Sequence, residues 1–324
     1  MTLAPPCSFA DLLVFLPYHV GFRLIDALVV VALDGARVDL VERVDIPPRG
    51  VLDPECIARM LLGVSNRRAS SLLVVAYADD LDPEPALAHL VGAMADTFGG
   101  DPEIARVAVV GRDRWREPPH GPWQDLPDPA DVPIVAEYVG RGVSPLPDRH
   151  ALVAALAPDP LLVRAAATAA GRLRPTPVEG LLAWERLVAG ESRESGGEDL
   201  FTTLAFVGHV RGRDALLSRL VPLGVADDGL YGRCDGGEGD HTRHVDPLAR
   251  RSAVRAALIR LVRASPPGWR ATTLTILGAW AWDAGDGALA SVATALALQE
   301  DPSCTLAGVV ARLVQFGIRP RCEV

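Results

Sequence analysis

The pattern that most constrains the fold is an alternation of buried strands and amphipathic helices over the first 110 residues. Residues 27–33 and 72–77 are continuous apolar runs, and residues 104–110 form an apolar run that only Arg106 interrupts, as in strands that are covered on both faces of a sheet. A helix start, in which aspartate precedes proline, stands between successive runs, and each is followed by apolar residues at helical spacing. The sequence therefore predicts a sheet whose strands are connected by helices.

A turn signal joins the first apolar run to another strand. Asp34-Gly35 favours a hairpin, and residues 38–46 then alternate apolar and charged side chains. Glu42 interrupts the apolar side, so we expect this strand to lie near an edge. Strand–helix–strand connections of this length imply parallel neighbours. The prediction is a small mixed, mostly parallel sheet with flanking helices, made of one antiparallel hairpin strand and three parallel strands.

The rest of the chain has a different pattern. Residues 112–149 are rich in proline and polar residues, which predicts a long loop with one helix near 131–139. Beyond them the periodicity is helical apart from two loops. A chain of 324 residues is long enough for about two domains. We expect an α/β domain over residues 1–145 and an all-α domain over residues 146–324.

Residues 269–302 read as a helix, a Gly-Asp-Gly turn and a second helix. The length and layout of this helical hairpin resemble one tetratricopeptide repeat. A repeat array needs about three such units to bury a continuous core, and the sequence has no second copy. We therefore expect a single hairpin, in a helical region through which a protein partner is bound.

All 32 basic residues are arginine, because the chain contains no lysine. A pyridoxal-phosphate site and a Schiff-base mechanism are excluded, since both need a lysine amine. A P-loop nucleotide site and a protein-kinase active site are excluded for the same reason. We therefore expect no organic cofactor. A bound divalent metal ion is still compatible with the sequence.

The charge and composition of the chain limit the kinds of partner and the cellular compartment that we expect. The net charge of −9 lies entirely in the first 150 residues, and an acidic half of this kind repels phosphate backbones, so we expect no general nucleic-acid binding. No apolar stretch reaches the roughly 18 residues of a membrane span, and the start of the chain lacks signal-peptide features. The five cysteines are scattered without paired spacing, which is typical of a reducing compartment. We expect a cytoplasmic protein without membrane contact.

Polar residues follow two of the buried runs directly. Asp79 and Asp80 come after one run, and Arg112, Arg114 and Trp115 come after the next. In open α/β sheets, ligands bind at the carboxyl ends of the strands. Paired carboxylates could hold a divalent cation there, and arginine could bind an anionic group with two hydrogen bonds. The alternative is that the carboxylates cap backbone groups and stay solvated.

Two further sets of residues are candidates. Tyr18 and His19 lie in the N-terminal apolar segment, where His19 could act as a general base, although no nucleophile motif accompanies it. A packed or surface histidine is the alternative. Cys234, His241 and His244 have side chains that suit zinc, within a loop that also carries acidic residues. Because no second cysteine is near, a solvated loop is the alternative there.

Short motifs along the chain are similar to those of a known family. They are Asp11-Leu12-Leu13, Pro17-Tyr18, Gly21-Phe22, residues 28–31 and 43–47, Tyr77-Ala78-Asp79-Asp80, Gly111-Arg112, Arg213-Asp214-Ala215-Leu216, and residues 284–289. On these motifs the chain resembles the actinobacterial family described as domain of unknown function 4192. Relatives carry a Gly-Arg-Trp-Trp segment followed by cysteine. This chain has Trp115 but no cysteine there, so no metal role of that segment is implied. The resemblance implies a shared fold and no particular activity.

Two functions therefore remain open. The first is a cytoplasmic, non-enzymatic binding or assembly protein. The second is a metal-assisted hydrolase or transferase with its site at the carboxyl edge of the N-terminal sheet. A deep pocket around Asp79, Asp80 and Arg112 would favour the enzyme, and a large apolar patch on helices near 271–300 would favour the binding protein. The sequence determines neither the ligand nor the oligomeric state.

Overall fold

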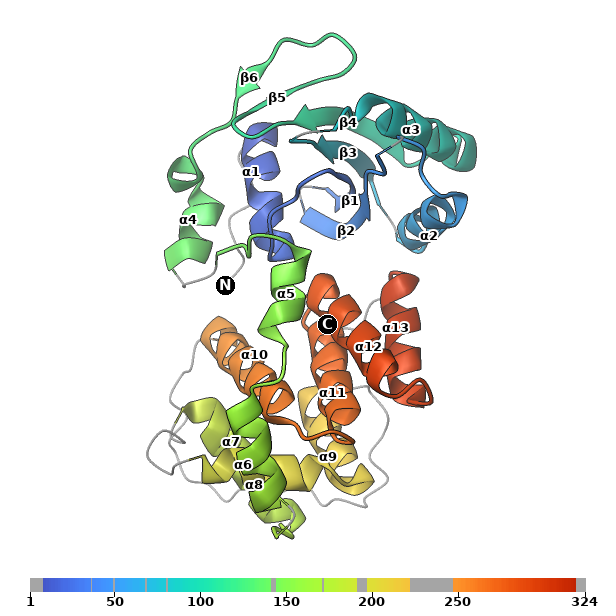
Figure 1. The fold of residues 1–324 in the computed structure, drawn as a ribbon. Helices are drawn as coiled ribbons and strands as arrows, with labels where there is room; N and C mark the ends of the chain where they lie inside the picture. The colour runs from blue at the N-terminus through green and yellow to red at the C-terminus, as the bar shows by residue number, and fades with distance from the viewer. Residues whose placement is uncertain are drawn as a thin grey trace. The chain divides into compact units, whose positions relative to one another are not determined.

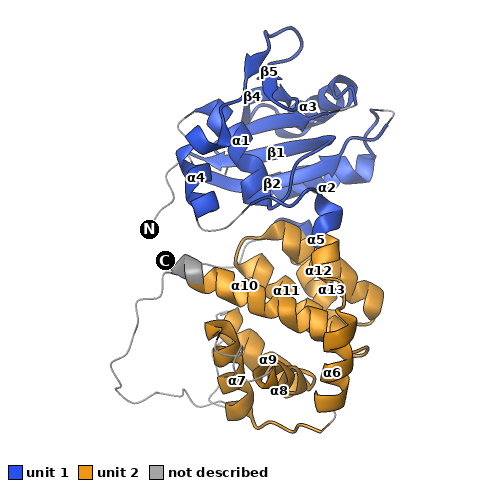
Figure 2. Cartoon of the chain, turned by 60° about the vertical axis from the view of Figure 1, so that its left-hand side comes forward, with its two compact units in different colours: residues 1–152, 315–318 blue, residues 153–314, 319–324 orange. Residues whose placement is uncertain are grey.

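The chain forms two compact units, shown in separate colours in Figure 2. We name Met1–Leu152 with Gln315–Ile318 the sheet unit, and Val153–Val314 the helical unit. The computed structural model describes residues 8–318 except 36, 49, 68, 80, 141–143, 171, 191–196 and 222–246. The segment Gln315–Ile318 thus belongs to the sheet unit although it follows the helical unit in the chain.

The sheet unit is built on a mixed sheet (Figure 1). Its strands, in the spatial order β2-β1-β3-β4-β5-β6, are β1 (Ala27–Asp34), β2 (Arg37–Asp45), β3 (Ser71–Tyr77), β4 (Glu103–Val110), β5 (Arg114–Arg116) and β6 (Gln124–Asp125). The central strand β1 is antiparallel to both β2 and β3. Only β3 and β4 pair in parallel among these strands.

The prediction of a mostly parallel sheet is therefore wrong. Since β2 and β3 both run opposite to β1, strands β2, β3 and β4 share one direction, as expected. However, β1 lies between β2 and β3, so the connection through α2 (Pro54–Ser65) crosses over a strand instead of joining neighbours. A continuous apolar run indicates that a strand is covered on both faces; it carries no information about the direction of its neighbours. Strands β5 and β6 come from the stretch expected to be a loop.

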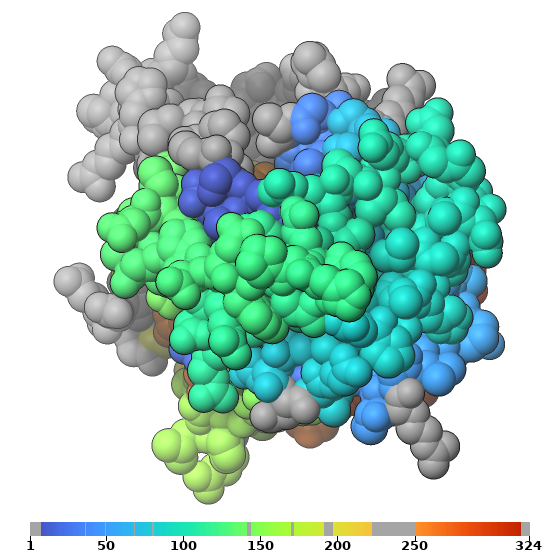
Figure 3. Space-filling view, turned by 90° about the horizontal axis from the view of Figure 1, so that it is seen from above, coloured from blue at the N-terminus to red at the C-terminus, as the bar shows by residue number. Residues whose placement is uncertain are grey.

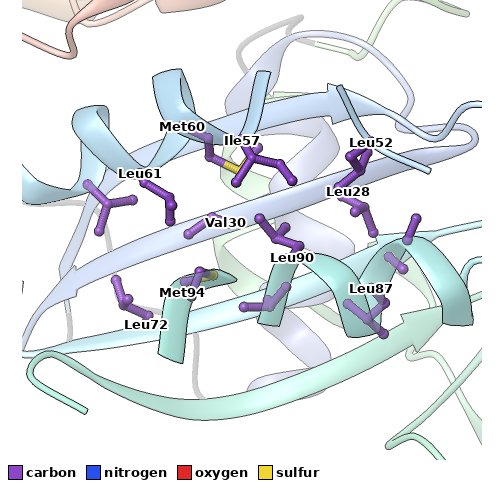
Figure 4. Close-up of a cluster of buried hydrophobic side chains, with 14 of the residues drawn as sticks. Leu28, Val30, Leu52, Ile57, Met60, Leu61, Leu72, Leu87, Leu90 and Met94 are labelled. Carbon is purple, nitrogen blue, oxygen red and sulfur yellow. The ribbon is translucent and has the colours of Figure 1, made fainter. Parts of the chain in front are cut away.

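Helices α2 and α3 (Glu84–Phe98) cover one face of the sheet. The Asp53 carboxylate caps α2 by accepting a hydrogen bond from the N–H of Glu55 at 2.8 Å. Figure 4 shows the side chains that point between these helices and the strands. They include Leu28, Val30, Leu72, Ile57, Met60, Leu61, Leu87, Leu90 and Met94.

The opposite face is covered by α1 (Phe9–Val20), and α4 (Pro133–Gly140) packs beside that helix. The Tyr77 hydroxyl donates a hydrogen bond of 2.7 Å to the Leu13 carbonyl, which ties β3 to α1. Phe15 packs edge-to-face on Tyr138 at 5.6 Å between ring centroids and joins α1 to α4. The result is a sheet between two layers of helices.

Glu42 occupies an unusual position on β2. This strand is at the edge of the sheet, as its charged residue predicted. The carboxyl group lies against α2, where a Cβ on Gly63 would be 2.7 Å from Glu42 Oε1. Burial raises the pKa of Glu42 from 4.5 to about 7, and attraction to Arg67 only partly offsets that rise.

The described part of the helical unit consists of helices and their connections. They are the end of α5 (Arg149–Ala155), then α6 (Pro160–Ala170), α7 (Pro177–Ala189), α8 (Glu198–Val207), α9 (Val210–Leu220), α10 (Pro247–Ala264), α11 (Arg270–Asp283), α12 (Gly287–Glu300) and α13 (Thr305–Gln315). Helices α11 and α12 form a hairpin in the segment 269–302. They approach closely at Gly278, where a Cβ would lie only 2.7 Å from Thr294 Cγ2.

A buried arginine fixes the start of α11. The Arg270 side chain donates from Nε to Glu300 Oε1 at 2.9 Å, from Nη1 to the Val262 carbonyl at 3.2 Å, and from Nη2 to the Leu156 carbonyl at 3.0 Å. These bonds link α11 to α12, to α10 and to the residue that follows α5. The planar guanidinium therefore joins several segments of the helical unit at one point.

One stretch of the described chain, Arg149–Ala169, is long and apolar enough to cross a membrane by length and composition. A single stretch of this kind is weak evidence for a span. In the structure it is divided into α5 and α6, and the Asp159 carboxylate caps the second helix at the N–H of Leu161, 3.0 Å away.

Candidate functional site

The structure brings together two of the residues predicted at the sheet edge. Asp79 follows β3 and Arg112 follows β4, and Arg112 Nη2 lies 3.8 Å from Asp79 Oδ2. The backbone N–H of Asp79 also donates to Asp26 Oδ1 at 3.2 Å, next to the start of β1. The Arg112 side chain is 83% exposed, so this pair is open to water. An ion pair in that setting contributes little free energy.

The next two candidates lie on β5 and face different surroundings. Trp115 is buried and packs edge-to-face on Phe9, with 5.3 Å between the ring centroids. It is therefore part of the core and is not available to a ligand at the surface. The Arg114 guanidinium stacks over the ring of Trp123 at 4.7 Å, as a cation–π contact. Figure 3 shows the sheet unit from above, with the segment that contains β5 and β6 toward the viewer.

The remaining predicted residues are apart from that edge or outside the described residues. His19 is exposed on α1 with its ring 5.5 Å from that of Phe15, and Tyr18 beside it is half-buried. Asp80, Cys234, His241 and His244 lie outside the described residues. Within the part of the chain that the structure describes, no three His, Cys, Asp or Glu side chains gather as metal ligands would.

The helical unit contains a groove that the sequence did not reveal. It has a volume of about 720 Å³ and lies between the first turns of α9, α11 and α13 and the connection from α12 to α13. We name it the α9–α11–α13 groove. Its apolar wall is formed by Ala271, Leu306 and Val309. Gly268 at its border has a φ of +87°, a backbone conformation that side chains other than glycine rarely adopt.

Polar and charged groups line the rest of the groove. Arg213 Nε donates to Asp214 Oδ1 at 2.8 Å, so these two charges are paired at the α9 side. On the other side, the hydroxyl and the N–H of Ser303 donate to Asp301 Oδ1 at 2.7 and 2.9 Å. These bonds hold the pKa of the Asp301 carboxyl below its ordinary value. Asp301 therefore stays negatively charged at neutral pH.

Hydroxyl and thiol groups complete the lining. Thr272 comes from the first turn of α11, and Thr305 from the start of α13. The Cys304 thiol also lines the groove and lies 3.5 Å from Thr275 Oγ1. The groove thus offers hydrogen-bonding groups beside an apolar wall. No base, nucleophile and oxyanion donor converge there among the described side chains, as acyl transfer would require.

Two signals in the sequence pointed toward this groove. The predicted hairpin over residues 269–302 supplies Ala271, Thr272, Glu300 and Asp301 to its lining. Arg213 and Asp214 belong to a motif that carries the family resemblance, and both line it. The other lining residues come from segments about 55 to 95 positions further along the chain. No short motif contains them, because helix packing alone brings those segments together.

By its fold, this protein is of the class in which an α/β unit with a mixed sheet is followed by an all-helical unit. The chain belongs to the family described as "Domain of unknown function (DUF4192)", whose match covers residues 10–321. The comparison with curated proteins and the comparison with solved structures find no match.

Proposed function

We propose that this protein is a non-enzymatic binding protein of the cytoplasm, and that its helical unit holds a segment of a partner protein. The α9–α11–α13 groove is the observation that supports this function most strongly. Its volume of about 720 Å³ lies within the range of roughly 300–1,000 Å³ that is typical of ligand sites. Leu306 and Val309 supply apolar contact area, while Thr272 and Ser303 supply hydrogen bonds.

A peptide segment fits this lining better than a small anion. An anion would need a free cation, but Arg213 already donates to Asp214. A peptide backbone offers both donors and acceptors to the hydroxyl groups, and its side chains can cover the apolar wall. Asp301 keeps its negative charge at neutral pH, so a basic side chain in the bound segment would complement it.

The sheet edge offers less to the alternative function, a metal-assisted hydrolase or transferase. Catalysis by charged groups depends on holding them in place away from bulk water. The Arg112 side chain is mostly exposed, and its Nη2 atom lies 3.8 Å from Asp79 Oδ2. Neither of these two side chains is held in the way that transition-state stabilisation requires.

The test is native mass spectrometry of the full chain purified from its source organism. Thr272→Arg would fill the groove, and we expect it to lose the bound partner that the unmodified protein retains. Thr168→Arg, on the exposed surface of α6, adds the same side chain elsewhere and should retain the partner. Arg112→Ala should also retain it. Loss of binding in Arg112→Ala with retention in Thr272→Arg would move the site to the sheet edge and contradict the proposal.

A further inference from the structure

The helical unit contains a second cavity, at one end of a group of four helices. Helices α9 and α10 each pack against both α7 and α11 (Figure 1). The cavity lies where α7, α9 and α11 end and α10 begins, and it has a volume of about 250 Å³. We name it the Trp184–Trp280 pocket. None of the residues that line it also lines the α9–α11–α13 groove.

The floor of this pocket is apolar. It is formed by buried side chains from three helices, namely Trp184 of α7, Val254 of α10 and Trp280 of α11. The half-buried Val188 and Ala284 extend the apolar surface. A small apolar group that rests on this floor is removed from water and gains contact with these side chains.

Arginines from two helices line the opening of the pocket. Arg219 lies at the end of α9, and Arg250 and Arg251 lie near the start of α10. Arg219 Nε donates to Glu185 Oε1 at 2.9 Å. Arg250 Nη2 is 3.7 Å from Glu185 Oε2, which is too far for a hydrogen bond.

Two of these guanidinium groups therefore have unused donors. Among the side chains that the structure describes, neither Arg250 nor Arg251 donates a hydrogen bond to a protein group. A guanidinium with unused N–H groups can hold a carboxylate through two parallel hydrogen bonds. The pocket thus supplies the available cations that the α9–α11–α13 groove lacks.

The charges at the opening are also unbalanced. The three guanidinium groups face two carboxyl groups, those of Glu185 and Asp283, so at least one positive charge is not compensated. Burial raises the pKa of Asp283, and attraction to Arg251 offsets only part of that rise. A ligand with one negative charge would restore the balance. A phosphate group, with a charge of about −1.5 to −2 at neutral pH, would exceed it.

We propose that the Trp184–Trp280 pocket binds a small organic monocarboxylate, whose apolar part rests on the floor and whose carboxylate is held by Arg250 and Arg251. The volume of about 250 Å³ lies below the roughly 300–1,000 Å³ of typical ligand sites, so the apolar part has to be compact. This site adds a second ligand to the helical unit and does not depend on the partner segment proposed for the groove.

Benzoate is the probe that tests this site, because it carries one carboxylate on a compact apolar ring. Saturation-transfer NMR on the full chain at neutral pH detects its binding, and a titration gives the dissociation constant, which we expect to be about 1 mM or lower. Benzamide has the same shape without the charge, and acetate has the charge without the ring. Each should bind about tenfold more weakly than benzoate.

A matched pair of variants locates the site. Arg251→Gln removes a guanidinium with unused donors and should weaken benzoate binding about tenfold. Arg260→Gln makes the same charge change at an exposed position of the same helix, outside the pocket, and should bind benzoate as the unmodified chain does. Thr272→Arg should also leave benzoate binding unchanged, because it fills only the groove. The two proposals can therefore fail separately.

Three results would overturn the proposal. They are no saturable binding of benzoate to the unmodified chain, equal binding of benzamide and benzoate, and an equal loss in Arg251→Gln and Arg260→Gln. Both arginines are exposed, so we expect both variants to fold, and circular dichroism checks this. If Arg251→Gln does not fold, the comparison of benzoate with benzamide decides alone.

Discussion

The two units bury their polar groups differently. Seven polar or charged side chains are buried in the described chain, and all of them belong to the helical unit. They are Asp199, Thr203, Ser265, Arg270, Thr273, Thr275 and Thr294. The interior of the sheet unit is formed instead by aliphatic and aromatic residues, with Glu42 partly buried at its margin.

The backbone explains this difference. In a helix, a hydroxyl can donate to the carbonyl four residues earlier, which already accepts one hydrogen bond and has a second lone pair. Thr203, Ser265, Thr275 and Thr294 all do so, over distances of 2.6 to 2.8 Å. A strand offers no such local acceptor to its own side chains. Burial of a polar group in the sheet therefore carries a larger penalty, and the helical interior can be more polar without losing stability.

The largest expected effect comes from the buried arginine of the helical unit. Arg270→Met keeps most of the side-chain volume but removes its three hydrogen bonds and leaves Val262, Leu156 and Glu300 without their donor. We expect the free energy of unfolding to fall by about 3–4 kcal/mol, because the buried carbonyls of Val262 and Leu156 lose their donor, whereas the ion pair to the 43% exposed Glu300 adds little. Urea unfolding measures this change. Arg260→Met, at an exposed position of α10, is the matched control, and an equal loss in both variants would contradict the interpretation.

A smaller, pH-dependent effect is expected at Glu42 in the sheet unit. Its folded-state pKa of about 7 lies above the ordinary value of 4.5, so the folded chain binds the proton more tightly. The resulting stability is fully present below pH 4.5 and is lost as the pH rises through 7. Glu42→Gln cannot ionise. At pH 8 it should therefore unfold with a free energy about 2–3 kcal/mol higher than the unmodified chain, with little difference at about pH 4.

Calorimetry at both pH values checks that expectation. A Glu42→Gln protein whose stability changes with pH as the unmodified chain does would show that Glu42 is ionised in the folded state. Glu55→Gln, on the exposed side of α2, is a control for the loss of one carboxylate.

The smallest effects are expected from two opposite substitutions, one in each unit, which test directly whether a helix tolerates a buried hydroxyl better than a strand does. Val31→Thr introduces a hydroxyl into the middle of β1 without a local acceptor, and we expect a loss of about 2 kcal/mol. Thr294→Val removes a hydroxyl bonded to the Ala290 carbonyl, with an expected loss of about 1 kcal/mol. Both are measured by chemical unfolding. A larger loss for Thr294→Val than for Val31→Thr would refute the backbone explanation.

Local patterns in the sequence were sufficient to predict most elements of the sheet unit. The apolar runs located β1, β3 and β4, and Glu42 placed β2 at an edge. The order of the strands was not predictable, because the insertion of β1 between β2 and β3 depends on tertiary packing. The apolar all-round pattern before Gly21 likewise did not indicate helix α1, whose Pro17 lies inside the helix.

The candidate sites, too, were predictable only where they depend on local sequence patterns and not on tertiary packing. Asp79 and Arg112 follow adjacent parallel strands, so their proximity was predictable from the sequence. The burial of Trp115 was not, since it depends on Phe9 of a distant helix. The groove depends on the packing of three helices that are far apart in the chain, and sequence spacing does not encode such a meeting.

The central claim is that ligand binding belongs to the helical unit and not to the sheet edge. Hydrogen–deuterium exchange tests it most directly, by comparing the full chain bound to its partner with the free chain. We expect slower exchange in the backbone of residues 209–214, 268–272 and 301–309, which border the groove. Protection confined to the residues around Asp79 and Arg112, with unchanged exchange along the groove, would contradict that claim.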